Sequence, residues 1–235
     1  MPTPKPIKVV LRRHGEKSKS NYGLDLSSNG MKQAITVGTK ISKKTPTKFY
    51  SSSVPRANQT ARLIKESLNG SGGRVYSSDV RVRKKMGEDL ISVKNNDYTP
   101  YFSYMKGFKT EVEAYRAWTL GKTPEGLFKS PNQVVYDVIK NISLAQYIQK
   151  RRNQSVQTRK LTENESKGIN FDYTGHSWIN DVVFETLTGK RITTLTKETE
   201  PINFTFHSNG RIALVFRKER FDVTRKFNEI LSQKK

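Results

Sequence analysis

Apolar residues in the first part of the chain form a short run and then a helical stripe. Residues 7–11 are mostly apolar and β-branched, come after the proline-rich stretch 2–6, and predict a short buried strand. A helix is expected next, with Ser27 or Ser28 as its N-cap. Its apolar stripe consists of Met31, Ala34, Ile35, Gly38 and Ile41. Strand followed by helix is the order typical of an α/β protein.

A second strand and helix repeat this order. Residues 48–51 predict the strand, and a helix begins at Pro55, since proline is favoured in the first helical turn. The apolar stripe of this helix consists of Ala57, Ala61, Ile64 and Leu68. Arg56 therefore lies in the first turn of a helix, just beyond the carboxyl end of a strand. Another short strand is expected at 79–82.

The stretch 103–159 is mainly helical by its spacing. The two clearest helices cover 111–120 and 132–152. Aromatic residues stand ahead of these helices or within the first one: Tyr101, Phe102, Tyr104, Phe108, Tyr115 and Trp118. Two interpretations of this aromatic group stay open, a cap over a ligand site and packing in an interior core.

The last third of the chain predicts another strand and helix. A strand beginning at Ile169 leads to His176, which opens a helix that reaches Leu187. The apolar stripe of this helix consists of Ile179, Val182, Val183 and Leu187.

A β-hairpin is expected near the carboxyl end. Alternating apolar residues at 202–216 flank Asn209-Gly210, which is a strong turn signal. We expect the hairpin to form an antiparallel edge of the sheet, with Arg211 and Arg217 exposed on it. His207 is then a hairpin residue for which no catalytic role is expected.

Three predicted strands end beside residues that can bind or attack a phosphoryl group. These residues are His14, Arg56 and His176. Ligands bind at the carboxyl ends of strands in open α/β sheets, so we expect one crevice for all three. A neutral imidazole can attack phosphorus, and the guanidinium of Arg13 can bind two phosphoryl oxygens at once.

The sequence motifs in these segments resemble those of the histidine phosphatase superfamily, which has the phosphoglycerate mutase-like fold. The matching segments are Arg13-His14-Gly15-Glu16, Leu26-Ser27-Ser28-Asn29-Gly30, the run 51–61 around Arg56, and the run 169–179 around His176. The resemblance implies an α/β three-layer sandwich, with a mostly parallel central sheet flanked by helices. We expect residues 1–235 to form a single domain with a mainly helical insertion at about 94–166.

The resemblance also implies a mechanism and site residues. His14 would be the nucleophile that forms a phosphohistidine, and Arg13, Arg56 and His176 would hold the phosphoryl oxygens and stabilise the transition state. Neighbouring arginines should disfavour the protonated form of His14. This chemistry needs no metal and no organic cofactor.

The proton for the leaving oxygen has two main candidate donors and a weaker third one. Glu88 occupies roughly the place where family members carry their acid, and Asp89 is the alternative. Glu16 is a weaker candidate that can pair with Lys17 or Arg12. Arg12 should point away from Arg13, because side chains alternate along a strand.

Residues just after the nucleophile can add contacts to an anionic substrate. Lys17 and Asn21 are the predicted substrate-binding residues, together with Arg13, Arg56 and His176. The sequence of the segment 17–23 differs from the one that usually follows Arg-His-Gly in mutases, so hydrolysis of a phosphomonoester is favoured. A phosphoglycerate mutase-like phosphomutase is the alternative.

Composition excludes several classes of protein. The 235-residue chain has no cysteine and three histidines, so thiol catalysis is excluded and a histidine metal site is not expected. An apolar run of membrane-spanning length or a signal peptide is absent from the sequence, and a cytoplasmic location is therefore expected, without membrane contact.

The charge allows another class of function. Lys and Arg number 43 against 21 Asp and Glu, a net charge of +22, and such a field attracts polyanions. A nucleic-acid-binding protein on this scaffold is thus a further alternative, although a small phosphorylated substrate is the favoured partner. The sequence leaves the oligomeric state open.

Overall fold

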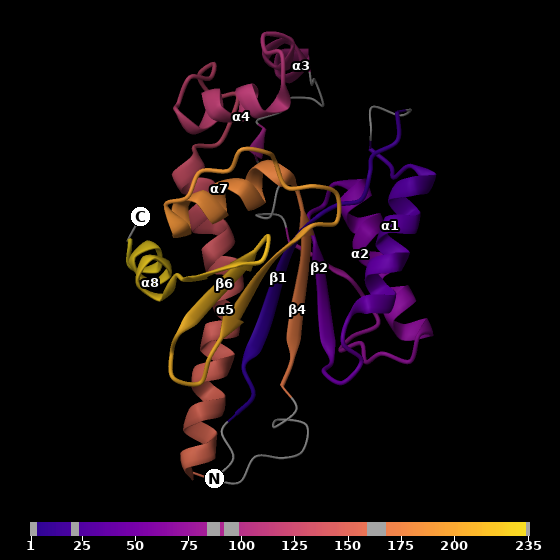
Figure 1. Cartoon of the computed structure of the whole chain (residues 1–235), viewed down its shortest axis with the longest axis vertical. Helices are drawn as coiled ribbons and strands as arrows, with labels where there is room; N and C mark the ends of the chain where they lie inside the picture. The colour runs from indigo at the N-terminus through magenta and orange to yellow at the C-terminus, as the bar shows by residue number, and fades with distance from the viewer. Residues whose placement is uncertain (1–3, 20–23, 84–89, 92–98, 159–167, 234–235) are drawn as a thin grey trace.

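A computed structural model describes residues 4–19, 24–83, 90–91, 99–158 and 168–233. Strands and helices alternate through the first half, as the apolar pattern predicts. The chain begins at one end of the sheet, where β1 starts, and the first strands run toward the opposite end (Figure 1).

The described residues form one seven-stranded sheet in the order β3-β2-β4-β1-β5-β6-β7. The strands are β1 (Ile7–Arg13), β2 (Thr47–Ser51), β3 (Arg81–Val82), β4 (Asn170–Gly175), β5 (Pro201–Phe206), β6 (Ile212–Phe216) and β7 (Glu219–Asp222). The β3-β2, β2-β4 and β4-β1 pairs are parallel, whereas β1-β5, β5-β6 and β6-β7 are antiparallel. The sheet is therefore evenly mixed rather than mostly parallel.

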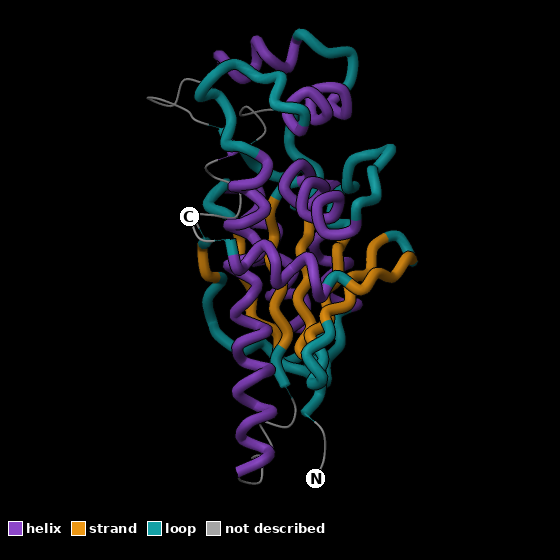
Figure 2. Tube along the Cα trace, turned by 90° about the vertical axis from the view of Figure 1, so that its left-hand side faces the viewer, coloured by secondary structure: helices purple, strands orange, loops and turns teal. Residues whose placement is uncertain are grey.

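Helices cover both faces of this sheet, which confirms the α/β fold with flanking helices (Figures 1 and 2). One face carries α1 (Ser28–Lys40) and α2 (Pro55–Gly70), and the other carries α5 (Pro131–Thr158), α7 (Ser177–Thr188) and α8 (Thr224–Ser232). The helices α3 (Thr99–Lys106) and α4 (Glu111–Thr119) lie beyond the carboxyl ends of the parallel strands. No helix in the described ranges has the length and hydrophobicity needed to cross a membrane.

Each face of the sheet has its own apolar core. The smaller core joins Phe49 of β2 to Ala34, Ile64 and Leu68 of α1 and α2. The larger core packs the other face against α5, α7 and α8, and its largest side chains include Trp118, Tyr115 and Phe227. The two cores hold the parallel strands rigidly, so that their carboxyl ends keep a fixed spacing.

The first helix shows how closely the sequence pattern matches the structure. Ser27 is the N-cap, because its hydroxyl accepts a hydrogen bond from the Gly30 amide at 3.0 Å. Gly30, Ala34 and Gly38 form the buried stripe. Ile35, which the pattern placed in that stripe, is 45% exposed, so this assignment was wrong. Close packing of α1 on α2 explains Gly38, because a Cβ there would lie 2.5 Å from the Ile64 carbonyl oxygen.

The antiparallel side of the sheet contains one strand more than the sequence analysis expected. The hairpin β5-β6 turns at Asn209-Gly210, and Gly210 has a φ of +84°. The outermost strand is β7, so the hairpin itself is not the edge. Arg211 and Arg217 flank β6, where Arg211 pairs with Asp222 and Arg217 with Glu200. Neither β7 nor α8 carried a recognised signal.

The domain boundaries remain a prediction. Helices α3, α4 and α5 lie within the stretch 94–166 that was proposed as an insertion. Of these, α5 packs on β1 and α7 and so belongs to the layer that covers the sheet.

Candidate active site

The register of three parallel strands brings the predicted site residues to one edge of the sheet. Arg13 at the end of β1 is level with Gly175 at the end of β4, and Ser51 of β2 is level with Thr174. The pairing continues one residue further, because the His14 amide donates to the Gly175 carbonyl at 3.0 Å. The loops that follow all three strands therefore begin side by side.

His14 lies buried between two hydrogen-bond partners that fix its tautomer. Its Nδ1 is 2.6 Å from the carbonyl oxygen of Gly15, which can only accept, so Nδ1 carries the proton. Its Nε2 accepts a hydrogen bond from the Nε–H of Arg56 at 2.9 Å. The ring of His176 stands edge-on to the ring of His14, with centroids 5.2 Å apart. The unprotonated nitrogen of His14 thus faces the guanidinium group of Arg56.

Both site histidines are held in the neutral form. Burial lowers the pKa of His14 to about 3, and the charges of Arg56, Arg13 and Lys17 act in the same direction. Burial also lowers the pKa of His176, with His14, Arg56 and Arg13 adding to the effect. The neutral form of His14 that the sequence analysis expected is therefore the stable form at neutral pH.

A contact between two glycines keeps the backbone close behind His14. A Cβ on Gly15 would lie 2.6 Å from the Gly30 carbonyl oxygen, and a Cβ on Gly30 would lie 2.2 Å from the Glu16 carbonyl oxygen. Neither position has room for a side chain. The Gly15 amide donates to the hydroxyl of Thr60, which in turn donates to the Arg56 carbonyl. The loop after β1 is thereby tied to the first turn of α2.

Arg13 reaches into the same cluster from the end of β1. One terminal nitrogen donates to the Thr196 carbonyl at 2.7 Å, and the other lies 3.3 Å from a carboxylate oxygen of Glu198. Thr196 is itself held by Asp181, whose carboxylate accepts from the amide and hydroxyl of Thr196. Burial raises the pKa of Asp181 to about 7. The loop between α7 and β5 therefore sets the direction of the Arg13 side chain.

Other residues considered in the sequence analysis lie outside this cluster. Arg12 points away from it, as expected, and pairs with the buried Asp172 at 2.9 Å. Glu16 pairs with neither Lys17 nor Arg12; instead it accepts hydrogen bonds from the Ser27 hydroxyl and the Asn29 amide. These two bonds lower the pKa of Glu16.

The remaining candidates are at the rim, at the far end of the strands, or outside the described residues. Lys17 is exposed, yet its charge contributes to the lowered pKa of His14. His207 follows β5, which runs antiparallel to β1, so it lies near the start of β1, at the opposite end of the strands from His14. Glu88, Asp89 and Asn21 fall outside the residues that the structure describes.

Several polar residues of the site were not singled out from the sequence. The Ser52 hydroxyl lies 3.2 Å from Nε2 of His176, and Thr60 supports Gly15 as described above. Both belong to the motif 51–61, so their position in that motif was an available signal. Thr196 and Glu198 had no such signal, because a loop between a helix and an antiparallel strand shows no periodicity. Asp181 lies within α7, and the sequence analysis singled out only the apolar stripe of that helix.

Several aromatic residues of the helical stretch pack on the interior core. Tyr115 and Trp118 are buried and pack with Trp178 in the larger core. Tyr101 of α3 is close enough to Arg56 for that charge to affect its pKa, although burial raises the Tyr101 pKa overall. The interpretation of the aromatic group as a cap over a ligand site stays a prediction.

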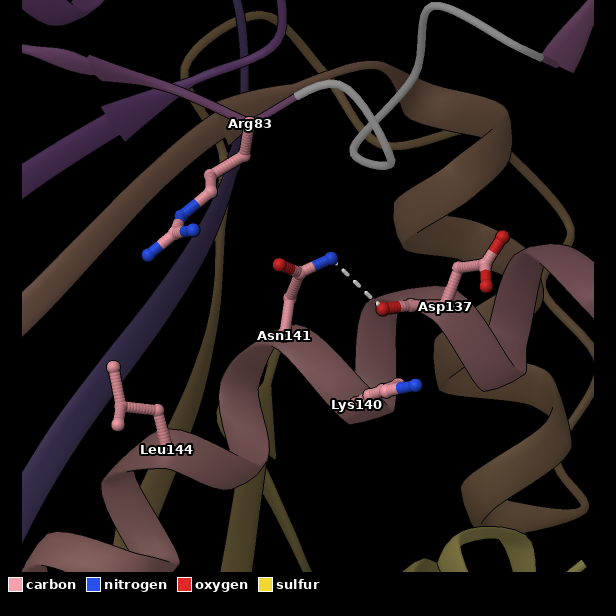
Figure 3. A pocket seen from close by; sticks show the side chains of 5 residues that line it. All are labelled: Arg83, Asp137, Lys140, Asn141 and Leu144. Atoms are coloured by element: carbon pink, nitrogen blue, oxygen red, sulfur yellow. Dashed lines mark hydrogen bonds between the residues drawn. The ribbon is translucent and has the colours of Figure 1, made fainter. Parts of the chain in front are cut away.

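A cavity of about 300 Å³ lies beneath the end of β3, on the face of the sheet that α5 covers. It is lined by Arg83, Asp137, Lys140, Asn141 and Leu144. Arg83 reaches toward it from the end of β3 and Asn141 from α5, where the Asn141 amide also donates to the Asp137 carbonyl (Figure 3). None of the four clustered residues His14, Arg13, Arg56 and His176 lines this cavity.

The cluster has the components of a phosphoryl-binding nucleophile site. It combines a neutral imidazole nitrogen with two guanidinium groups and a second neutral imidazole. Across the described part of the chain, no group of three or more histidine, aspartate or glutamate side chains has the geometry of a metal site.

One known protein family matches the sequence of this chain. The sequence profile described as "Histidine phosphatase superfamily (branch 1)" matches residues 9–135, which is more than half of the chain and includes Arg13, His14 and Arg56. No curated protein matches the sequence significantly.

Solved structures with the same fold include two proteins with named activities. A phosphoglycerate mutase from Bacillus anthracis str. Sterne superposes with a TM-score of 0.58 at 14% identity, covering 97% of this chain and 98% of that one. A mycobacterial glucosyl-3-phosphoglycerate phosphatase superposes with a TM-score of 0.54 at 16% identity, covering 86% and 92%. A structure described as mycobacterial hydrolase 1 has a TM-score of 0.58 at 16% identity, covering 92% and 100%. At these identities the likeness establishes the fold.

Proposed function

The chain belongs to branch 1 of the histidine phosphatase superfamily, and from this we propose that it is a metal-independent phosphatase that hydrolyses a small phosphomonoester through a phosphohistidine. The observation that carries the proposal is the tautomer of His14. Its Nδ1–H is bound to the Gly15 carbonyl, so the lone pair on Nε2 is available for attack. Its lowered pKa keeps that lone pair unprotonated.

In the first half of the reaction, Nε2 of His14 attacks phosphorus and the bond to the ester oxygen breaks. The Nε–H of Arg56 has to leave Nε2 for this step, and the phosphoryl oxygens of the substrate are stronger acceptors than an imidazole nitrogen. Arg13 and His176 stand close enough to share the remaining charge of the phosphoryl group. The departing oxygen takes a proton from an acid, for which we propose Glu88, with Asp89 as the alternative.

In the second half, water attacks the phosphorus of the phosphohistidine. The P–N bond breaks, phosphate leaves and the neutral imidazole of His14 is restored. The same acid, now ionised, accepts a proton from the water. Lys17 at the rim and Asn21 are the proposed additional contacts to the substrate.

The test compares phosphate release by the parent protein and by His14→Ala, in the presence of a chelator. The substrates are p-nitrophenyl phosphate and a panel of sugar, glycerate and nucleotide phosphates. We expect chelator-resistant turnover that His14→Ala reduces by at least about a thousandfold, since the covalent route is lost. His207→Ala is the matched control, because His207 lies at the opposite end of the strands from His14, and its activity should equal that of the parent.

A trapping experiment tests the intermediate itself. Acid-labile, alkali-stable label from a ³²P-phosphomonoester should appear on the parent and on His207→Ala, but not on His14→Ala. Turnover that is indifferent to His14, or that stops with the chelator, would rule out the proposal. Glu88→Gln and Asp89→Asn identify the acid, since the loss should be larger for an alkyl than for an aryl leaving group.

A further inference from the structure

A carboxylate stands beside the phosphoryl-binding arginine. Glu198, in the loop between α7 and β5, places a carboxylate oxygen 3.3 Å from a terminal nitrogen of Arg13. The Arg13 side chain is 15% exposed and the Glu198 side chain 35% exposed. Glu198 therefore lies at the rim of the site, where the interior cluster meets solvent.

The backbone around Glu198 is fastened to the end of β1. The Thr199 amide lies 3.2 Å from the Arg13 carbonyl oxygen and 3.3 Å from that of His14, and the Thr199 carbonyl accepts a bond from Arg12 at 2.8 Å. Thr199 holds a φ of +57°, which is unfavourable for a β-branched residue and shows that the surrounding contacts fix the turn. Because Thr196 is bound to Asp181 on the other side, the loop keeps Glu198 near Arg13.

This placement makes the charges around His14 locally unequal. Arg56, Arg13 and Lys17 add positive charge near His14. Of these three, Arg13 is the one that pairs with Glu198. A substrate whose phosphoryl group binds Arg13 brings the first atoms of its leaving group toward the rim where Glu198 stands.

We propose that Glu198 is a specificity-determining residue. It favours phosphomonoesters whose leaving group carries an ammonium or hydroxyl group near the ester oxygen, and it disfavours leaving groups with a carboxylate or second phosphate there. The cause is direct: a carboxylate attracts cations and hydrogen-bond donors and repels anions within several ångströms. This inference rests on the proposed function for the place of the phosphoryl group, and it adds the class of the substrate.

The experiment measures binding, so that its result does not depend on turnover. Two phosphonates of similar length and opposite charge are the probes: 2-aminoethylphosphonate and 2-carboxyethylphosphonate. Calorimetry gives their dissociation constants on the parent protein, where we expect the amino compound to bind more tightly. In Glu198→Gln the ratio of the two constants should shift by about fivefold or more in favour of the carboxylate, because one ligand loses attraction and the other loses repulsion.

Two further variants separate charge from structure. Glu198→Asp keeps the charge and should keep the preference of the parent. Glu200→Gln removes a carboxylate from the same loop that pairs with Arg217 rather than Arg13, and it should leave the ratio unchanged. Thermal unfolding of each variant establishes that it is folded.

The ratio of binding constants decides the proposal. A ratio that is unchanged in Glu198→Gln overturns it, as does an equal gain or loss in affinity for both probes, which would make Glu198 only a positioning residue or a general competitor for Arg13. Failure of either phosphonate to bind overturns it as well. These outcomes are distinct from failure of the proposed function, which shows as turnover indifferent to His14.

Discussion

At the scale of single residues, His14 depends on its neighbours for its protonation state. An isolated imidazole is half protonated near pH 6.5, and a protonated ring has no lone pair for attack. Burial and the charges of Arg56 and Arg13 favour the neutral ring, while the hydrogen bond to the Gly15 carbonyl acts in the opposite direction, and the net effect is a lowered pKa. The arginines that are proposed to bind the phosphoryl group thus also keep the proposed nucleophile uncharged.

The first prediction concerns the titration of the three histidines. Because the pKa of His14 is lowered to about 3 and that of His176 is also lowered, neither ring should titrate between pH 8 and pH 5. His207 is less buried, although its pKa is also lowered, so it should titrate at the highest pH of the three. Imidazole NMR signals, assigned with His14→Gln and His207→Gln, check this. A His14 signal that titrates between pH 5 and 7 would contradict the geometry of the site.

The lowered pKa values of His14 and His176 also make the stability of the fold depend on pH. The unfolded chain binds protons at both site histidines below pH 6.5, whereas the folded protein does so only at much lower pH. The free energy of unfolding should therefore decrease as pH falls below 6.5, by up to about 1.4 kcal/mol per pH unit for each of these histidines.

At the scale of elements, the pair Arg12 and Asp172 joins the two central strands. Both side chains are buried, at 7% and 2% exposure, and the partner atoms are 2.9 Å apart. Asp172→Asn leaves the Arg12 charge buried without a carboxylate, so we expect it to reduce the free energy of unfolding by about 3 kcal/mol or more. Urea denaturation measures this loss.

Glu219→Gln is the control for this prediction. Glu219 pairs with Lys190, and both side chains are 51% exposed, so its loss should cost about 0–1 kcal/mol. Equal effects of the two substitutions would show that the buried pair has no special role in joining β1 and β4.

The elements also show how far the sequence could be interpreted. The helix α2 carries a strong signal because it buries its full apolar stripe: Ala57, Ala61, Ile64 and Leu68 are all buried as predicted. The prediction that Ile35 is buried was wrong because the buried face of α1 includes Gly30 and Gly38, and glycines carry no apolar signal. The strand β7 was missed because its residues, Glu219–Asp222, lie at an exposed edge where selection for apolar residues is weak.

The candidate site was predictable to a similar extent. His14, Arg56 and His176 each follow a recognisable strand, so the rule that ligands bind at strand ends was enough to group them. Glu198 pairs with Arg13 from the loop between α7 and β5, and Asp181 of α7 binds Thr196 of the same loop. Contacts of this kind depend on tertiary structure rather than on local pattern.

At the scale of the whole molecule, the net charge of +22 exceeds what a site for one phosphate group requires. Not every basic residue contributes to the surface field. Arg152, in the basic run 150–152, is 8% exposed and donates to the Lys5 carbonyl, so it acts as a structural group. Its neighbour Arg151 is exposed and lies over the ring of Tyr147.

The last prediction separates this surface charge from the candidate site. A fluorescent 20-nucleotide DNA should bind at low salt, and its affinity should fall by about tenfold or more between 50 and 200 mM salt, because binding to a basic surface releases counterions. His14→Ala should bind the DNA as the parent does, and millimolar vanadate, which mimics phosphate, should not displace it. The surface field and the phosphoryl site would then act independently. Loss of DNA binding in His14→Ala, or displacement by vanadate, would instead mean that a nucleic-acid phosphate enters the site, and the alternative of a nucleic-acid function would gain its first direct support.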